Sequence, residues 1–350
     1  MLVEHAASGD RVAFEYEAVY ILSWKQHLVS ELVRLAVPVH GLSVRSELDV
    51  RWLTRLDRVV RHGRFDVVHI HSPSVAAAAR PLLRTRARRA SVVYTEHNRW
   101  PSYKRATRLA NYATYRLNDA IIAVSDAVRE SIAPSLRSSV EVVRHGIDVE
   151  RVQAMGAERV AVRKELGVQP DEVLAVTVAN LRWTKNYPGL LAAAKQVVEC
   201  DRSVRFVAAG QGPLEREVRA EHAALGLGDA FRLLGYRADA TRIVAAADLF
   251  VLASDHEGLP VSVMEALTLG VPVVATDVGG LREAVTDGCD GLLVEPRSPR
   301  ALADAVLRVA RDRELRARLS EHAARAGSRF SARLATARIE EVYRSVVRDP

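Results

Sequence analysis

Two glutamates, Glu257 and Glu265, are separated by seven residues in the stretch "SDHEGLPVSVMEALTLG", residues 254–270. Pro260 suits the start of a helix and Gly270 suits its end. Glu257 is therefore expected in the loop ahead of this helix, with Glu265 about 7–8 Å further along the axis. An acidic pair at this spacing could be a metal site, an acid/base pair, a clamp for a sugar or a solvated helix face.

The spacing disfavours the metal site. It is loose for two carboxylates that share one ion, and no Asp-x-Asp sequence occurs in the chain to hold a divalent cation on a diphosphate. Carboxylates are good acceptors for the paired hydroxyls of a sugar or a ribose. We therefore expect no metal here, and each glutamate can accept hydrogen bonds from one pair of hydroxyls.

Cationic side chains follow the strand predicted at 173–178, in the segment "ANLRWTKNYPGLLAA". Lys185 comes just before a predicted helix, whose N-terminal amides would attract an anion. Arg182 can make a forked contact to phosphate that a lysine cannot make, and Asn180 is close by in the sequence. The alternative is a solvated turn that carries two surface cations.

Glycines follow two further predicted strands. Gly210 and Gly212 lie in "AGQGPLEREV", where Glu215 replaces the third glycine of a dinucleotide fingerprint and no Walker lysine follows. Taken alone, this segment is best explained as a structural turn. Gly279 and Gly280 lie in "TDVGGLREAV" at the predicted mouth of a helix, where they offer backbone amides to an anion.

Short apolar runs alternate with helical stretches along the whole chain, which predicts parallel sheets covered by helices. A segment without strand pattern, with a helix expected at 158–166, marks a domain boundary near 149–170. A final helix is expected to place Leu334, Ile339, Val342 and Val346 near one face. The predicted strands are 11–16, 37–42, 66–70, 91–95, 119–124 and 140–143 in the first half, and 173–178, 204–209, 231–234, 248–253, 272–276 and 291–294 in the second.

These elements predict an α/β protein with two doubly wound domains and a cleft between them, in which ligands gather beyond the carboxyl ends of the strands. The composition fits: 350 residues, 49% hydrophobic and 27% charged, are enough for two soluble domains. The net charge of +7 is spread along the chain without any nucleic-acid motif, so nucleic acid is not an expected partner. Cys200 and Cys289 form no disulfide or metal pattern, and with no visible signal peptide or membrane span the expected location is the cytoplasm.

Several segments together resemble the retaining glycosyltransferases of family 4, which have the GT-B fold. In the second half these are "ANLRWTKN", "AAGQGP", "LLGY", "LASDHEGLPVSVMEALTLGVPVVATDVGGLREAV" and "DGLLVEP"; in the first half they are "FDVVHIHSP", "VVYTEHN", "AIIAVSDAVRESI" and "VVRHGID". The resemblance implies two Rossmann-like domains: residues 1–150 on the acceptor side and 151–330 on the nucleotide-sugar side. Residues 331–350 are expected to cross back to the first domain.

The resemblance also assigns roles to residues. Glu257 is implied to meet hydroxyls of the donor sugar, and Glu265 the ribose. Lys185 matches the family's diphosphate-binding lysine, whereas Asn180 occupies the usual arginine position, so Arg182 is expected to supply that cation. The other residues with an implied role are His97, which matches the histidine of the first domain that faces the reacting sugar, and the donor-binding residues Gly210, Gly212, Gly258, Leu259, Val261, Gly279 and Gly280; His145 replaces the family's usual Asn.

The implied reaction moves a sugar from a nucleoside diphosphate sugar to an acceptor hydroxyl, in the synthesis of a glycolipid, polysaccharide or cell-envelope glycan. No carboxylate stands out as a nucleophile, and the resemblance implies retention by same-face attack, without a metal and without a cofactor. Two other functions remain open: a non-catalytic binder of nucleotide sugars, including an inactive homologue, and a nucleotide-sugar epimerase. Transfer of the sugar to an acceptor would distinguish a glycosyltransferase from the binder and from the epimerase.

Two features depart from the family pattern. The basic segments 80–89, "RPLLRTRARR", and 99–108, "RWPSYKRATR", are either solvated helix faces or contacts to an anionic membrane or a lipid-linked acceptor at the inner membrane face. Family members also begin with a strand, a Gly-Gly loop and a helix, whereas this sequence opens at what resembles the end of that helix. We therefore expect the first sheet to have an unfilled or exposed edge.

Overall fold

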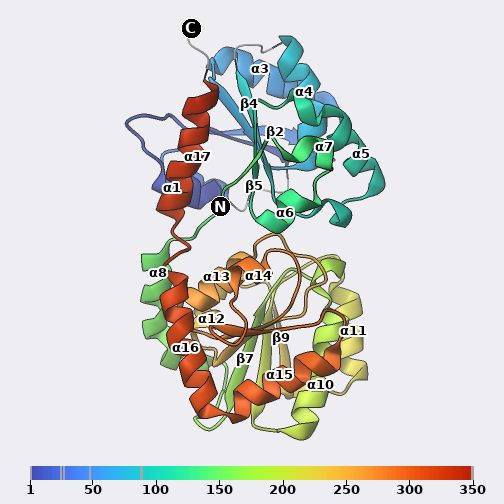
Figure 1. Ribbon diagram of the computed structural model, residues 1–350, viewed down its shortest axis with the longest axis vertical. Coiled ribbons are helices and arrows are strands. Elements are labelled where there is room, and N and C mark those ends of the chain that lie inside the picture. The colour runs from blue at the N-terminus through green and yellow to red at the C-terminus, as the bar shows by residue number, and fades with distance from the viewer. Residues whose placement is uncertain (1, 24–25, 27, 47–48, 87–89, 348–350) are drawn as a thin grey trace. The chain divides into compact units, whose positions relative to one another are not determined.

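The structure is a computed structural model that describes residues 2–23, 26, 28–46, 49–86 and 90–347. Its contacts divide the chain into two units. Unit 1 comprises Met1–Gly146 together with Ala332–Pro350, and unit 2 comprises Ile147–Ser331. Each unit is an α/β structure with parallel sheets, and each is described by itself (Figure 1).

Unit 2 contains one six-stranded parallel sheet with the order β12-β11-β10-β7-β8-β9. The predicted strands of this half are confirmed to within two residues, and those at the centre of the sheet, β7, β10 and β11, are apolar runs buried on both faces. The chain runs outward from β7 to β9 and then returns to place β10 on the other side of β7. The strands are β7 (Val173–Val178), β8 (Val204–Ala209), β9 (Phe231–Gly235), β10 (Leu249–Leu252), β11 (Val273–Thr276) and β12 (Gly291–Val294).

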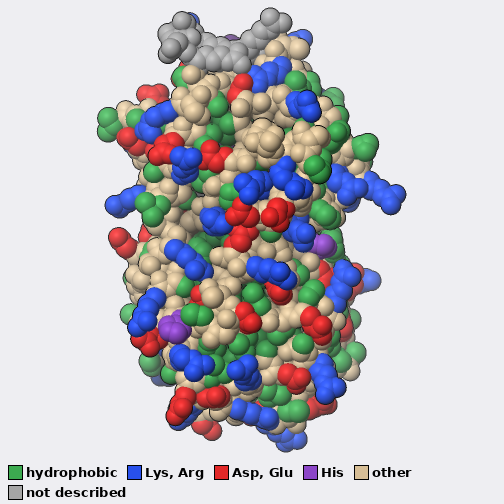
Figure 2. Space-filling view, in the orientation of Figure 1, with side chains coloured by type: hydrophobic (Ala, Val, Ile, Leu, Met, Phe, Trp, Pro, Cys, Tyr) green, Lys and Arg blue, Asp and Glu red, His purple; other side chains and the backbone are tan. Residues whose placement is uncertain are grey.

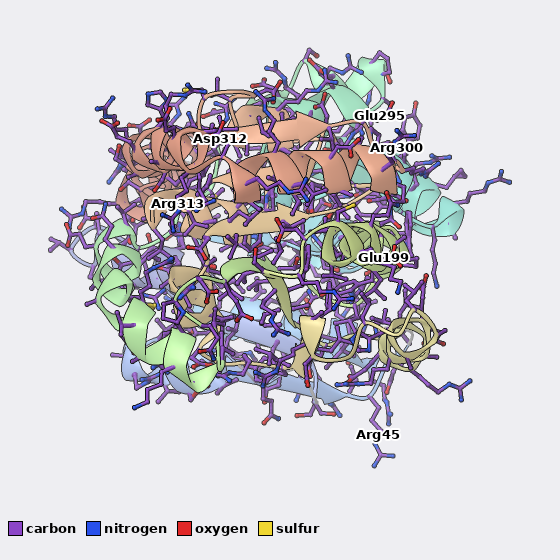
Figure 3. The ribbon with its side chains drawn as sticks, turned by 90° about the horizontal axis from the view of Figure 1, so that it is seen from below. Arg45, Glu199, Glu295, Arg300, Asp312 and Arg313 are labelled. Carbon is purple, nitrogen blue, oxygen red and sulfur yellow. The ribbon has the colours of Figure 1, made fainter. Side chains whose placement is uncertain are left out.

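Helices pack on this sheet in two groups. One group is α10 (Tyr187–Cys200), α11 (Glu215–Ala224) and α15 (Pro299–Arg311), whose apolar side chains share a core with Leu249 and Val251 of β10. In Figure 3, charged side chains of this group such as Glu199 and Arg300 point away from that core. α16 (Arg313–Gly327) contributes Leu315 and Leu319 to the same core and also packs beside α13. The other group is α8 (Val149–Ala154), α9 (Arg159–Glu165), α12 (Ala240–Ala245), α13 (Val261–Thr268) and α14 (Leu281–Ala284).

Unit 1 has two separate parallel sheets. One pairs β1 (Ala18–Leu22) with β2 (Val39–Val44), and the other has the order β3-β4-β5-β6, formed by Val67–Ile70, Ser91–Glu96, Ala120–Ala123 and Val140–Val142. Among the described residues no strand pairing joins β1 to β3. The described strands of unit 1 therefore belong to two sheets, one formed by β1 and β2 and one by β3 to β6.

The strand predicted at 11–16 is wrong. The side chain of Asp10 accepts hydrogen bonds from the amides of Val12 and Ala13 at 3.0 and 3.1 Å, and Phe14 N–H donates to the Asp10 carbonyl at 2.9 Å. These bonds close a turn, since an Asp side chain competes locally for backbone amides. The first strand therefore begins only at Ala18.

The last helix, α17 (Ala332–Val346), belongs to unit 1 and packs beside α1 (Leu2–Ser8). Its Val342 and Tyr343 are buried in a cluster with Val93 of β4. Leu334, which was expected on the same face, is instead 69% exposed. The remaining helices of unit 1 are α2 (Val29–Arg34), α3 (Arg51–Gly63), α4 (Pro73–Arg86), α5 (Arg105–Thr114), α6 (Asp126–Ser131) and α7 (Pro134–Arg137).

Candidate active site

Lys185 and Glu257 meet at the carboxyl ends of two neighbouring strands of unit 2. Lys185 ends a short 3-10 turn after β7, and Glu257 lies in the loop after β10. Because β7 and β10 pair directly, the two loops adjoin, and Lys185 Nζ lies 2.6 Å from Glu257 Oε1. In open parallel sheets ligands gather where the strand order reverses, which here is the point between β7 and β10.

Glu257 is held firmly in place. Its side chain is only 6% exposed, and the hydroxyl of Ser254 donates to the same Oε1 atom at 2.6 Å. The carbonyl of Ser254 in turn accepts from Thr276 Oγ1 at 2.5 Å. A buried carboxylate with a cation and a hydroxyl on one oxygen is oriented for accepting further hydrogen bonds on the other.

Backbone and side-chain contacts join the loops after β7 and β10. The amide of Asp255 donates to the carbonyl of Thr184 at 2.9 Å, and Asn186 Nδ2 donates to Asp255 Oδ1 at 3.3 Å. The rings of Trp183 and His256 meet edge to face, with centroids 5.1 Å apart. The Lys185–Glu257 pair therefore sits between two segments that support one another.

Three of the glycines predicted to bind donor have a reason in loop packing. A Cβ on Gly210 would lie 2.0 Å from the carbonyl oxygen of Ala179, and one on Gly212 would lie 2.3 Å from that of Leu181. A Cβ on Gly280 would lie 1.7 Å from the carbonyl oxygen of Gly258. Glycine is thus required so that the loops after β7 and β8, and those after β10 and β11, can touch through their backbones.

The start of α10 has fewer backbone donors for an anion than the sequence predicted. Pro188 has no N–H, and the N–H of Gly189 donates to Asn186 Oδ1 at 3.1 Å. Two of the first three helical positions therefore offer no donor to a ligand. α14, which follows Gly279 and Gly280, has only four residues and so little dipole. α13, in contrast, begins after Pro260 without a side-chain cap.

Glu265 lies on α13, as predicted. Thr241 of α12 donates a hydrogen bond from Oγ1 to Glu265 Oε1 at 2.9 Å. Leu259 is buried, so its contribution to a ligand is limited to its backbone, whereas Val261 is exposed. Sequence reasoning found Glu265 but not Thr241, because nothing in the sequence signals that α12 and α13 are neighbours.

Asn180 and Arg182 are exposed in the segment after β7. The amide of Arg182 donates to the carbonyl of Asn180 at 2.8 Å, and the amide of Lys185 donates to that of Arg182 at 2.9 Å. Arg182 and Lys185 therefore belong to one compact turn. Within the described part of the chain, Arg182 forms no ion pair, and no group of three or more His, Cys, Asp or Glu is placed to hold a metal ion.

His97 lies in unit 1, directly after β4. Its Nε2 is 3.0 Å from Nδ1 of His71, and burial lowers the pKa of His97 to about 4. His97 is therefore neutral at pH 7. His145, which replaces the family's Asn, is buried in the same unit. Sequence reasoning missed His71, although the alternating histidines of "HIH" were a visible signal.

Two arginines of the first basic segment have partners inside unit 1. Arg80 is fully buried and donates to Asn111 Oδ1 at 2.7 Å, while Arg84 pairs with Asp119 at 2.7 Å. Trp100 is 4% exposed, so it cannot anchor a membrane contact. Residues 87–89, and with them Arg88 and Arg89, lie outside the described residues.

The second basic segment surrounds a buried carboxylate. Glu96 accepts hydrogen bonds from Trp100 Nε1 at 2.8 Å, from Tyr94 Oη at 2.9 Å and from the hydroxyl of Tyr103. Burial raises the pKa of Glu96. The aromatic residues that were considered as membrane contacts therefore stabilise the loop next to His97.

Comparisons with known proteins identify the family of the chain. The family described as Glycosyl transferases group 1 matches residues 158–326, and Glycosyltransferase Family 4 matches residues 6–151. The lipopolysaccharide core biosynthesis mannosyltransferase LpsB of Rhizobium meliloti (strain 1021) is 30% identical over 281 residues, which cover 78% of this chain and 76% of LpsB. The alpha-D-kanosaminyltransferase of Streptomyces kanamyceticus is 27% identical over 313 residues, 84% of this chain and 81% of that protein.

A solved structure shows the same fold. The crystal structure of HepE from Anabaena in complex with UDP and glucose superposes with a TM-score of 0.86 over 98% of this chain and 95% of HepE, at 21% identity. The two family matches cover both halves of the chain, and LpsB matches most of its length. The chain therefore belongs to the group 1 glycosyltransferases of family 4 and has the two-domain GT-B fold.

Proposed function

We propose that the chain transfers a sugar from a nucleoside diphosphate sugar to an acceptor hydroxyl, with retention of configuration and without a metal ion. The observation that carries the proposal is the Lys185–Glu257 pair at the point where the strand order of unit 2 reverses. It puts a cation for a diphosphate beside a carboxylate for sugar hydroxyls. The crystals of HepE, which contained UDP with glucose or UDP-glucose, support a donor of this class.

In the proposed reaction the acceptor oxygen forms a bond to C1 of the sugar while the bond from C1 to the diphosphate oxygen breaks. The diphosphate leaves with the electron pair, and one of its oxygens takes the proton of the attacking hydroxyl. Lys185 and Arg182, which share one turn after β7, are placed to stabilise the charge that develops on the diphosphate. His97 is proposed to contact the reacting sugar, as the family resemblance implies.

Glu257 acts in this scheme by binding and not as a nucleophile. One of its oxygens already accepts from Lys185 and Ser254, and such contacts stabilise the carboxylate and lower its reactivity. Its role is to orient the donor sugar through hydroxyl hydrogen bonds. Glu265, oriented by Thr241, accepts from the ribose.

The testing experiment is a thermal-shift screen of the purified chain against a panel of nucleoside diphosphate sugars, followed by an assay of nucleoside diphosphate release with and without candidate acceptors. We expect one donor to raise the melting temperature, and EDTA to leave transfer unchanged. Binding without transfer or hydrolysis would favour the non-catalytic binder. Interconversion of the donor without an acceptor would favour the epimerase, and activity abolished by EDTA and restored by a divalent ion would contradict the metal-free scheme.

For the acceptor, contact with an anionic lipid surface is proposed to run through α5, which begins within the second basic segment, and not through Trp100 or the buried arginine of α4. α5 exposes Leu109 and Tyr112 next to Arg105 and Arg108, and no acidic residue lies in its first turn. Exposed apolar side chains flanked by cations suit a membrane interface. Figure 2 shows basic and acidic side chains intermingled over the face that it presents. In addition, no helix of the described chain is both long and apolar enough to span a bilayer.

A further inference from the structure

Three histidines of unit 1 lie on one face of its four-stranded sheet. β3 pairs in parallel with β4 so that Val67 is opposite Ser91 and His69 is opposite Val93. Since side chains alternate along a strand, His69 and His71 point to the same face as Thr95 and His97. α17 lies over this face: Ser91 Oγ donates to the Val346 carbonyl at 2.6 Å, and Tyr343 Oη lies 2.7 Å from His69 Nδ1.

The ring of His71 has a histidine neighbour on each side, His69 and His97. Its ring centroid lies 4.2 Å from that of His69 and 5.3 Å from that of His97, with interplanar angles of 32° and 30°. His69 is itself held at both nitrogens, by Tyr343 Oη and by Thr95 Oγ1, each at 2.7 Å. His71 therefore has little freedom to rotate, and its Nδ1 stays directed at His97 Nε2 at 3.0 Å.

The hydrogen bond between His71 and His97 couples their tautomers. Burial lowers the pKa of His69 and His71 well below the usual value and that of His97 to about 4, so all three rings are neutral at pH 7. A neutral imidazole has one nitrogen that donates and one that accepts. If His71 Nδ1 donates, the proton of His97 must be on its Nδ1; if His71 Nδ1 accepts, it must be on Nε2.

We propose that His71 is a positioning residue that selects the tautomer and the ring orientation of His97, and so decides whether His97 offers a donor or an acceptor at its Nδ1. The proposal rests on the function proposed above insofar as His97 faces the reacting sugar. A fixed tautomer matters there because a ring that presents the wrong nitrogen makes no hydrogen bond to a hydroxyl. His69, Thr95 and Tyr343 support the arrangement by holding the ring on which His71 stacks.

The experiment records the ring nitrogen signals of the protein labelled with 15N-histidine, with His97 assigned by its loss in His97→Phe. In the wild type we expect one protonated and one unprotonated nitrogen signal for His97 at pH 7. In His71→Phe, which keeps an aromatic ring but removes both nitrogens, we expect averaged signals from two tautomers. His62→Phe, a change of an exposed histidine on α3, is the matched control and leaves the His97 signals unchanged.

Kinetics then test the consequence for transfer. We expect His71→Phe to lower kcat by roughly three- to tenfold, the effect of losing one hydrogen bond, with the donor KM unchanged. His71→Asn, which retains an amide near the position of Nδ1 but not the ring, should be the more active of the two. The reverse order would mean that His71 acts by packing.

The two readouts separate failure of this proposal from failure of the proposed function. Unchanged His97 signals in His71→Phe would overturn the proposal whatever the activity. Averaged signals together with wild-type turnover in His71→Phe, when His97→Phe is inactive, would overturn the positioning role. A wild type that transfers no sugar would refute the proposed function, while the nitrogen signals would still decide whether His71 fixes the tautomer.

Discussion

At the scale of single residues, Lys185 forms an ion pair with the buried Glu257, and in the proposed reaction it also binds the diphosphate. Lys185→Met should abolish most transfer and also lower the free energy of unfolding by about 1–3 kcal/mol, because a buried carboxylate loses its cation. The double variant Lys185→Met with Glu257→Gln should recover stability but not activity. Urea unfolding and a transfer assay on the same samples check both, and equal stability of all three proteins would contradict the structural role of the pair.

Glu265 gives a prediction about the nucleotide. Glu265→Gln should weaken binding of the free nucleoside diphosphate by about 1–3 kcal/mol, the cost of a lost hydrogen bond to a charged group. Thr241→Val, which removes the hydroxyl that orients Glu265, should weaken it less, and Thr241→Ser should keep wild-type affinity. Calorimetric titration measures all three. Wild-type affinity in Glu265→Gln would show that this carboxylate does not bind the ribose.

At the scale of elements, the loops at the strand ends of unit 2 contact each other through their backbones at glycine residues. Gly280→Ala should lower the free energy of unfolding by about 1–3 kcal/mol, since its Cβ would collide with the backbone of Gly258 and neither loop can give way alone. Gly156→Ala is the matched control, because there the nearest atom to a Cβ is a Leu269 methyl group at 4.0 Å. Similar urea midpoints for the two variants would mean that the loops move independently.

α5 carries the prediction about lipid surfaces. Replacing Arg105 and Arg108 by Gln should reduce sedimentation with anionic liposomes at low salt, since each cation near such a surface contributes about 1 kcal/mol. Replacing the exposed Arg300 and Arg308 of α15 is the control with the same change in net charge. If the wild-type protein does not sediment with the liposomes, α5 is an ordinary solvated helix and not a lipid contact.

How far the sequence predicted these elements depends on the kind of signal. β7, β8 and β12 were found with their correct bounds, because each is a short run dominated by apolar residues with a break in the pattern on either side. The first strand was misplaced because the turn at Asp10 depends on side-chain hydrogen bonds that periodicity does not register. Arg80 was assigned to the surface because its buried partner Asn111 is distant in sequence.

The same limit applies to the site. Glu257, Glu265 and Lys185 were recognised one at a time, but their partners Ser254 and Thr241 were not. The contact between Lys185 and Glu257 follows from the sheet order, which places β10 beside β7, and a single sequence does not specify that order. Chemistry that resides in one side chain is predictable from sequence, whereas orientation by a neighbour requires the fold.

At the scale of the whole molecule, stability should depend on pH through the buried histidines. His5 and His97 have pKa values lowered by burial to about 4, and those of His69 and His71 are also lowered. The unfolded chain therefore binds more protons than the folded one below about pH 6.5, so stability falls as the pH drops toward 4, by about 1.4 kcal/mol per pH unit for each such histidine. Glu96, whose pKa is raised by burial, acts in the opposite direction.

Urea unfolding of the wild type and of His71→Phe between pH 7.5 and pH 5 measures this dependence. We expect the wild type to lose stability more steeply, since the variant has one fewer buried base to protonate on unfolding. Parallel curves would show that His71 binds protons equally in the folded and unfolded chain. The comparison also cancels the contribution of Glu96, which both proteins share.

Unit 1 is built from both ends of the chain, since α17 supplies Val342 and Tyr343 to the core that β4 and β5 begin. During synthesis the ribosome makes the strands of that unit first and the helix that covers them last, after all of unit 2 has emerged. The apolar face of β4 therefore stays exposed while unit 2 is translated. Exposed apolar surface of this kind binds chaperones and promotes aggregation. A nascent chain released before Ala332 would thus contain all of unit 2 but lack the helix that covers the sheet of unit 1. The fifteen residues of α17 complete the core that residues 1–146 begin.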